Sequence, residues 1–113
     1  MQVIIAFVGL LLLGLQTASA AQSPLSREVE RGRAFAQRQC ATCHAVGRTG
    51  SSPYEPAPPF RTLHERYDVE GLAEALAEGI VVGHTGARQM PQFVLSASEI
   101  DDLLAYLKSL GPR

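Results

Sequence analysis

The sequence lacks an apolar run of the length that a membrane-spanning helix needs, it lacks an excess of basic charge, and it has only two cysteines. Ten lysine and arginine residues stand against eleven acidic residues, and this balance argues against a nucleic-acid partner. It also argues against strong long-range steering toward a highly charged partner. No nucleophile with a base, no paired carboxylates and no open metal site are found, so the chain is not expected to be an enzyme by itself.

The amino-terminal segment differs in character from the rest of the chain. Val3 to Leu15 is almost wholly apolar, and no charged side chain precedes Arg27. The small residues at 18–20 follow at the spacing that a signal peptidase accepts, so residues 1–20 are predicted to be a secretory signal peptide and residues 21–113 the mature domain. This predicts a periplasmic protein with no membrane span after cleavage. Because no lysine or arginine precedes the apolar run, an uncleaved amino-terminal anchor is the alternative.

The mature domain is predicted to be all-α, since no strand pattern of useful length is present. Four helical segments are expected. They are a helix from an N-cap at Ser26 towards Cys40, a turn over Arg61–Tyr67, a helix from an N-cap at Asp68 to Ile80, and a helix from the Ser96–Glu99 capping box to Gly111. The glycines and prolines of residues 46–59 predict a long irregular loop, which normally needs something to wrap around.

The main chemical motif is Cys40-Ala41-Thr42-Cys43-His44. This C-x-x-C-H pattern predicts covalent attachment of one c-type haem. Two thiols about one helical turn apart can add to the two vinyl groups on one porphyrin edge, while His44 places its imidazole beneath the iron. A disulfide between Cys40 and Cys43 would close a very small loop and would constrain little of the unfolded chain.

Three other interpretations of the two cysteines remain open at this point. A thioredoxin-like C-x-x-C has the same spacing, but it belongs after a strand in a mixed α/β unit. A zinc site would need a fourth ligand, which His64 or His84 could formally provide. The third is chance occurrence of the pattern.

The sixth coordination position of the iron decides whether a haem protein transfers electrons or binds small ligands. Met90 is the only methionine besides the initiator, and it lies in a predicted loop before Pro91. We therefore predict Met90 as the distal ligand. His84, on the same loop, is the alternative and would lower the reduction potential.

The chain resembles a class I cytochrome c of the small bacterial, monohaem type from Glu28 to Leu110. Gly32 matches the glycine of the family's first helix, Tyr106 matches the aromatic residue of its last helix, and Gly83–Phe93 is similar to its distal-ligand loop. The resemblance implies a compact fold of three to five helices around one haem, with crossing terminal helices. It favours Met90 over His84, and it implies that the carbonyl of Pro58 supports His44.

The sequence departs from the family at two places. The aromatic residue expected four positions before the first cysteine is Ala36, with Phe35 one place early, and residues 47–56 have no clear counterpart. Four further residues could pair with haem propionates, although each also fits an ordinary surface or packing position. They are Arg61, Arg66, Arg88 and Tyr67.

The function predicted from these features is one-electron transfer between redox proteins. Two alternatives use the same residues. One is the electron-entry subunit of a periplasmic oxidoreductase. The other is a haem-based gas-binding or sensor module, in which Met90 leaves the iron.

Overall fold

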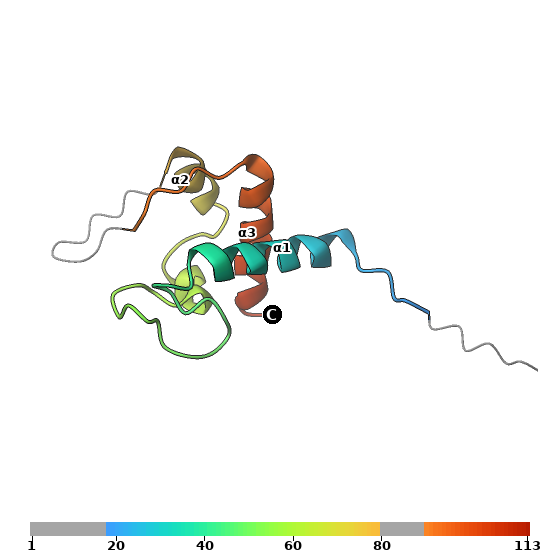
Figure 1. Cartoon of the computed structure of the whole chain (residues 1–113), viewed down its shortest axis with the longest axis horizontal. Coiled ribbons are helices and arrows are strands. Elements are labelled where there is room, and N and C mark those ends of the chain that lie inside the picture. Colours follow the sequence, from blue (N-terminus) through green and yellow to red (C-terminus); the bar gives the residue numbers. More distant parts are fainter. Residues whose placement is uncertain (1–17, 80–89) are drawn as a thin grey trace, which may run out of the picture.

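The computed structural model describes residues 18–79 and 90–113 (Figure 1). These contain the helices α1 (Pro24–Gln39), α2 (Leu72–Glu78) and α3 (Ala97–Leu110), together with the 3-10 helix η1 (Phe60–Glu65). No strand occurs in the described residues, and the all-α prediction is confirmed. Within these two ranges no helix is both long and apolar enough to cross a membrane. Most of the predicted signal peptide, residues 1–17, lies outside the described residues.

Helix α1 begins earlier than the sequence predicted. Ser23 is the N-cap, and its hydroxyl oxygen accepts a hydrogen bond from the backbone N–H of Ser26 at 3.2 Å. The prediction of Ser26 as the cap was wrong, because Pro24 is a favourable first helical residue: its φ is already helical and it lacks an N–H that would need a partner. The helix ends at Cys40, whose N–H donates to the Ala36 carbonyl at 2.9 Å.

The segment between the two long helices forms less helix than expected. The predicted turn is the 3-10 helix η1, shifted by one residue at its start. Asp68 does not cap α2; its carboxylate accepts a hydrogen bond from the Glu70 N–H at 3.2 Å and stabilises a turn, and α2 starts at Leu72 after Gly71. This prediction was wrong because an aspartate that bonds two residues ahead makes a turn as readily as a helix cap.

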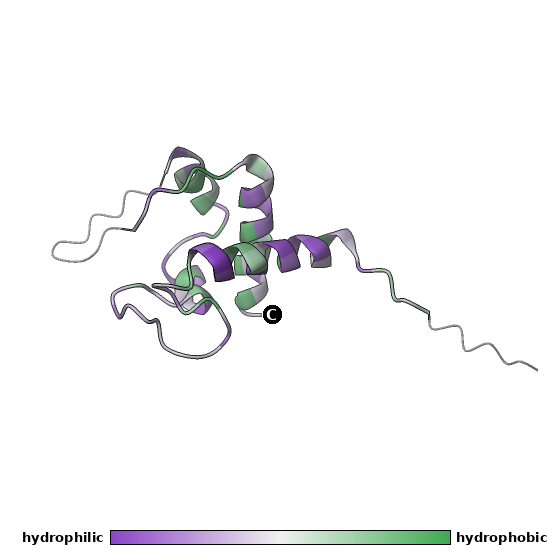
Figure 2. Ribbon diagram, viewed as in Figure 1, coloured by the Kyte–Doolittle hydropathy of each residue, from purple (hydrophilic) through white to green (hydrophobic). Residues whose placement is uncertain are grey.

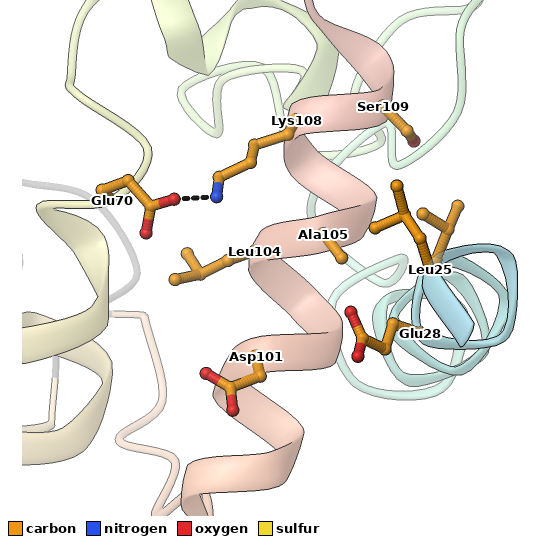
Figure 3. Close-up of a pocket in the computed structure, with 9 residues that line it drawn as sticks. Leu25, Glu28, Glu70, Asp101, Leu104, Ala105, Lys108 and Ser109 are labelled. Carbon is orange, nitrogen blue, oxygen red and sulfur yellow. Dashed lines mark ion pairs between the residues drawn. The ribbon is translucent and has the colours of Figure 1, made fainter. Parts of the chain in front are cut away.

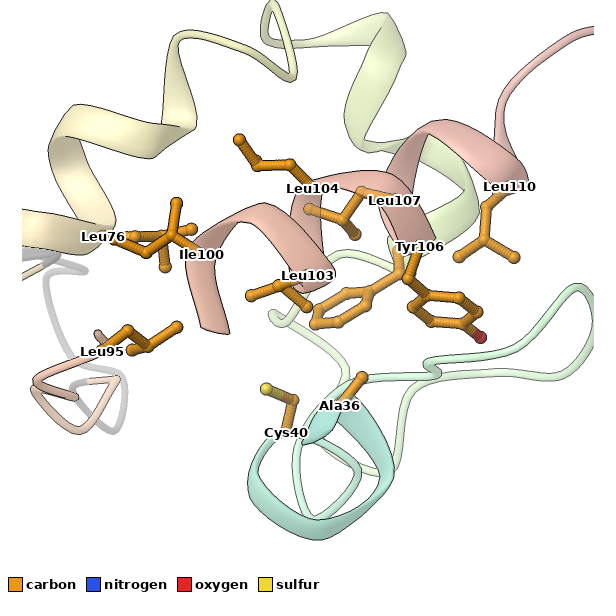
Figure 4. Packing of buried hydrophobic residues seen from close by; sticks show 11 residues of the cluster. Ala36, Cys40, Leu76, Leu95, Ile100, Leu103, Leu104, Tyr106, Leu107 and Leu110 are labelled. Carbon is orange, nitrogen blue, oxygen red and sulfur yellow. The ribbon is translucent and has the colours of Figure 1, made fainter. Parts of the chain in front are cut away.

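Helix α3 has the predicted capping box. The Ser96 hydroxyl accepts from the Glu99 N–H at 3.3 Å, and the Glu99 carboxylate accepts from the Ser96 N–H at 2.9 Å. The helix ends at Gly111, as expected. It contacts the other three helices, and its apolar residues supply most of the core (Figure 4).

Helices α1 and α3 cross at a point where the chain leaves room for only a glycine. A Cβ atom added to Gly32 would press on the Asp102 carbonyl, lying 2.6 Å from its carbon and 2.8 Å from Tyr106 Cβ. One turn further along α1, Ala36 is completely buried. In Figure 2, α1 is mainly hydrophilic except where it crosses α3.

An ion pair fixes the same crossing from its edge. Arg31 donates two hydrogen bonds to the Asp102 carboxylate, from Nε at 2.7 Å and from Nη2 at 2.8 Å. This contact raises the pKa of Arg31. Asp102 is 8% exposed and is the buried charged residue of the described core, so its carboxylate needs this partner. At this crossing the backbones of α1 and α3 therefore lie close together. The close approach accommodates both the expected glycine and the alanine at position 36, where the family has an aromatic residue.

Candidate functional site

The cysteine motif occupies one tight turn at the end of α1. The N–H groups of Cys43 and His44 both donate to the Cys40 carbonyl, at 3.2 and 2.9 Å. Both thiols are free. One turn of chain therefore presents two sulfur atoms and an imidazole, which is the arrangement that attachment along one porphyrin edge requires.

His44 is oriented by the loop that follows it. Its Nδ1 lies 2.8 Å from the carbonyl oxygen of Pro58. Because a carbonyl can only accept, Nδ1 is the donor in this contact, and Nε2 is the ring nitrogen left to ligate a metal. The hydrogen bond between His44 and Pro58 is present as the resemblance implied.

Phe60 adds a second constraint on the imidazole. Its ring centroid is 5.1 Å from that of His44, with the planes inclined by 50°, and the side chain is buried. Phe60 was not among the site residues predicted from the sequence. The signal that could have found it is its place two residues after Pro58, since a residue so close to the hydrogen-bonded carbonyl must lie near the ring.

The irregular loop returns to the cysteine turn, and this was not predicted. The N–H of Tyr54 donates to the Cys43 carbonyl at 3.1 Å, and the N–H of Ala45 donates to the Ser52 hydroxyl at 3.0 Å. At its start the loop is joined to α3, since the Tyr106 hydroxyl donates to the Val46 carbonyl at 2.5 Å. Burial raises the pKa of Tyr106, in agreement with a phenol that donates its proton inside the fold.

The environment of Cys40 disfavours a thiol redox site. Cys40 is 8% exposed, and burial raises the pKa of its thiol to about 11. Reactive redox cysteines have lowered pKa values in electropositive, accessible surroundings, which is the opposite situation. In Figure 4 the sulfur points towards Leu95 and Leu103 of the apolar core. The thioredoxin-like alternative is also weakened because the described residues contain no strand to precede the motif.

The histidines proposed for zinc do not join the two thiols within the described residues. His64 is exposed at η1 and lies beside the end of α3, where its ring is 3.9 Å from a Cβ built on Gly111. His84 lies outside the described residues. Residues 18–79 and 90–113 contain no group of three His, Cys, Asp or Glu side chains that could hold a metal ion.

Met90 opens the second described range, in an extended segment that leads to α3. The residue is half-buried, and the neighbouring Phe93 and Leu95 pack on the core. Val94, between them, is 96% exposed. Alternation of inward and outward side chains shows that this segment lies along the surface of the core with one face covered. The role of Met90 as an iron ligand stays a prediction.

An open groove of about 500 Å³ lies between the start of α1 and α3 (Figure 3). Leu25 and Glu28 line one side, and Leu104 lies on the other. Lys108 forms an ion pair with Glu70 at its rim. None of the motif residues lines it. It is therefore separate from the site at Cys40 and His44.

The residues of the site fit a haem c. One turn of the chain carries two thiols and an imidazole whose Nε2 is available to a metal. Apolar side chains of the core lie next to Cys40. One buried donor also stands out: Nη1 of Arg61 is the buried side-chain polar atom of the described residues that has no hydrogen-bond partner. An acidic group brought into the fold would satisfy it, and haem carries two propionates.

Comparison with known proteins agrees with this fit. The family model for cytochrome c matches residues 29–111. A cytochrome c-552 from Bradyrhizobium diazoefficiens is 34% identical over 100 residues, covering 88% of this chain and 91% of that protein. No match was found among solved structures. The chain therefore belongs to the cytochrome c family, as a class I monohaem member whose covalently bound haem c serves electron transfer.

Proposed function

We propose that this protein is a periplasmic one-electron carrier, with haem attached at Cys40 and Cys43 and the iron ligated by His44 and Met90. The observation that carries the proposal is the 2.8 Å hydrogen bond between His44 Nδ1 and the Pro58 carbonyl. It fixes the imidazole tautomer and directs Nε2 away from the chain that holds the ring. When bound, the haem supplies an iron that alternates between the ferric and ferrous states.

The residues around His44 keep the proximal side fixed during electron transfer. The Pro58 carbonyl prevents rotation of the imidazole about its Cβ–Cγ bond, and the tilted ring of Phe60 blocks movement to one side. The hydrogen bond also makes the ligating nitrogen more basic. A carrier needs such rigidity, because small changes in ligand position between redox states keep the reorganisation small.

Met90 is the proposed distal ligand because its chemistry and position both suit the role. A thioether ligand opposite a histidine raises the reduction potential relative to two histidines. The segment that holds Met90 is attached to the core on the carboxyl side through Phe93 and Leu95. His84 is the rival ligand in the proposal.

Export is proposed from the amino-terminal segment. Residues 18–23 are exposed and not helical, so the predicted cleavage position after Ala20 is accessible in an extended chain. Cleavage there would leave the Ser23 cap of α1 intact. Mass spectrometry of the exported protein tests this: the expected species is residues 21–113 plus one haem.

The ligand assignment is tested by a Met90→Ala variant, with His84→Ala as the matched control. We expect a low-spin c-type spectrum with a weak far-red band from the bond between methionine sulfur and iron. The band should disappear in Met90→Ala and persist in His84→Ala. Persistence in Met90→Ala would remove Met90 from the site, and loss in His84→Ala alone would give the position to His84.

The carrier role is tested by ligand binding to the ferrous protein. A carrier whose two axial ligands stay bound should not take up carbon monoxide in the absence of denaturant, whereas Met90→Ala should. Rapid binding by the unmodified protein would favour the gas-binding alternative over electron transfer.

A further inference from the structure

We propose that Ser52 is a positioning residue for the proximal ligand, and that its hydroxyl sets the hydrogen bond between His44 and Pro58. The inference deepens the proposed function, since it rests on His44 as a ligand of the iron of a bound haem. It starts from one side-chain contact in the irregular loop. The Ser52 hydroxyl oxygen accepts a hydrogen bond at 3.0 Å from the backbone N–H of Ala45, the residue that directly follows His44.

The backbone on both sides of His44 is held by one short piece of the loop. On the amino side, the Cys43 carbonyl accepts from the Tyr54 N–H at 3.1 Å. On the carboxyl side, the Ala45 N–H donates to Ser52. The two contacts pair the chain segments in opposite directions, and the Ser52 hydroxyl takes the place that a backbone carbonyl has in an antiparallel pair. One of the two contacts that flank His44 therefore depends on a side chain.

Ala45 is the common anchor for both arms of the loop that carries Pro58. Its N–H is bonded to Ser52, which precedes Pro58, and its carbonyl accepts at 2.9 Å from the N–H of Phe60, which follows Pro58. Pro58 is thus held from both directions on the residue next to His44. A shift of the Ser52 arm would move the Pro58 carbonyl relative to the imidazole, whose Nδ1 is 2.8 Å away.

Removal of the Ser52 hydroxyl would leave a buried donor without its acceptor. Ala45 is buried, and a buried N–H that loses its partner is more unfavourable than the same hydrogen bond was favourable. In Ser52→Ala the loop is therefore expected to move until the Ala45 N–H finds another acceptor or a water molecule. Either change displaces the Pro58 carbonyl from Nδ1 of His44.

A weaker hydrogen bond at Nδ1 changes the electron donation of His44 to the iron. The Pro58 carbonyl makes the ligating nitrogen of the imidazole more basic. A more basic ligand favours the ferric state, so a weaker hydrogen bond raises the reduction potential. Ser52 acts through the loop backbone and not on the iron, so its effect should be smaller than that of a change of axial ligand.

The first test uses the unmodified holoprotein, so that it does not depend on the folding of a variant. In the diamagnetic ferrous state, nuclear Overhauser contacts should join the Ala45 amide proton to the β protons of Ser52. The Ala45 amide should also exchange with solvent far more slowly than the amide of the exposed Thr49. An Ala45 amide that exchanges as fast as that of Thr49, or that lacks contacts to Ser52, would overturn the proposal.

The second test compares Ser52→Ala with Ser51→Ala. Ser51 is the matched control, because it is the neighbouring serine and is exposed. Ser52→Ala should raise the reduction potential and shift the resonance of the His44 Nδ1 proton in the direction of a weaker hydrogen bond, whereas Ser51→Ala should change neither. Ser52→Thr keeps the hydroxyl and should restore most of both values. A merely structural role would lower the stability of Ser52→Ala and leave potential and resonance unchanged, and that result would overturn the proposal.

The two proposals fail in different ways. A protein without a covalent haem, or one in which neither Met90→Ala nor His84→Ala changes the far-red band, would contradict the proposed function. A normal haem spectrum with an unchanged potential in Ser52→Ala would contradict only the role of Ser52.

Discussion

At the scale of single residues, the structure shows polar groups held by short local contacts. Glu99 is an example, because its carboxylate receives hydrogen bonds from both the backbone N–H and the hydroxyl of Ser96. These bonds favour the ionised carboxylate and lower the pKa of Glu99. A carboxyl group whose pKa is lower in the folded than in the unfolded protein stabilises the fold above its unfolded pKa, and this contribution is lost as the pH falls through the folded pKa.

We therefore predict that Glu99→Gln lowers the stability at pH 7 and that the difference from the unmodified protein disappears in acid. The glutamine keeps a weaker capping contact but not the charge at the helix start. Denaturant unfolding between pH 7 and about pH 3 measures both effects, since the usual pKa of glutamate is near 4.3. Glu65→Gln is the control, because Glu65 is exposed on η1. A difference between the Glu99 variant and the unmodified protein that stays constant across this range would show that ionisation of Glu99 is irrelevant.

At the scale of the helices, the crossing of α1 and α3 depends on Gly32. Alanine normally favours an isolated helix by about 1 kcal/mol relative to glycine. Here the added methyl group would overlap the Asp102 backbone and approach the Tyr106 side chain, and neither can move without shifting α3. The same shift would stretch the hydrogen bonds from Arg31 to the Asp102 side chain.

Gly32→Ala is therefore predicted to destabilise the protein by about 1 to 3 kcal/mol despite its better helix propensity. Gly47→Ala is the matched control, since a Cβ there meets nothing within 4 Å, and its effect should stay within about 0.5 kcal/mol. The midpoint of guanidinium unfolding gives both values. A Gly32→Ala variant as stable as the unmodified protein would mean that the two helices do not meet at this residue.

The helices also show which local sequence signals are sufficient to predict where a helix begins. The box at Ser96 and Glu99 was predictable because both partners are in the pattern and each satisfies the other. Ser26 and Asp68 were wrong as caps because a lone polar side chain is compatible with several local structures. Pro24 outweighed Ser26 in the first case, and a turn through Glu70 replaced the helix start in the second.

At the scale of the whole molecule, the motif at Cys40 was predictable because its chemistry depends on spacing within one turn. Apart from the contact between Pro58 and His44, which the family resemblance implied, the support of that turn by the loop was not predictable. Its contacts join Tyr54 to Cys43, Ser52 to Ala45 and Tyr106 to Val46, and each depends on the path of a segment rich in proline and glycine. Such a path follows from long-range packing rather than from local preference. The buried, unpaired Nη1 of Arg61 was not predictable either, because the type of a residue does not reveal whether its side chain is buried.

The large apolar side chains of the core are not fully buried in the described residues. Its large apolar residues retain between 4% and 7% exposure, and no large side chain in the described residues is less than 2% exposed. A domain of this size has a net stability of about 5 to 14 kcal/mol. Exposing one large apolar side chain costs about 1.5 to 3 kcal/mol, so loss of packing around three or four of them removes most of that stability.

We therefore predict that the double variant Cys40→Ala/Cys43→Ala, which cannot attach haem covalently, does not unfold cooperatively. Two alanines are good helix formers, so the substitutions themselves do not disfavour the end of α1. The loss would instead come from the missing covalent link between the cofactor and the end of α1, where Cys40 lies in one apolar cluster with Leu95 and Leu103. Thermal unfolding followed by far-ultraviolet circular dichroism tests this, with Met90→Ala as the control because it keeps the covalent haem. A sharp transition in the double variant at the temperature of the unmodified protein would show that the four helices form a stable core without the cofactor.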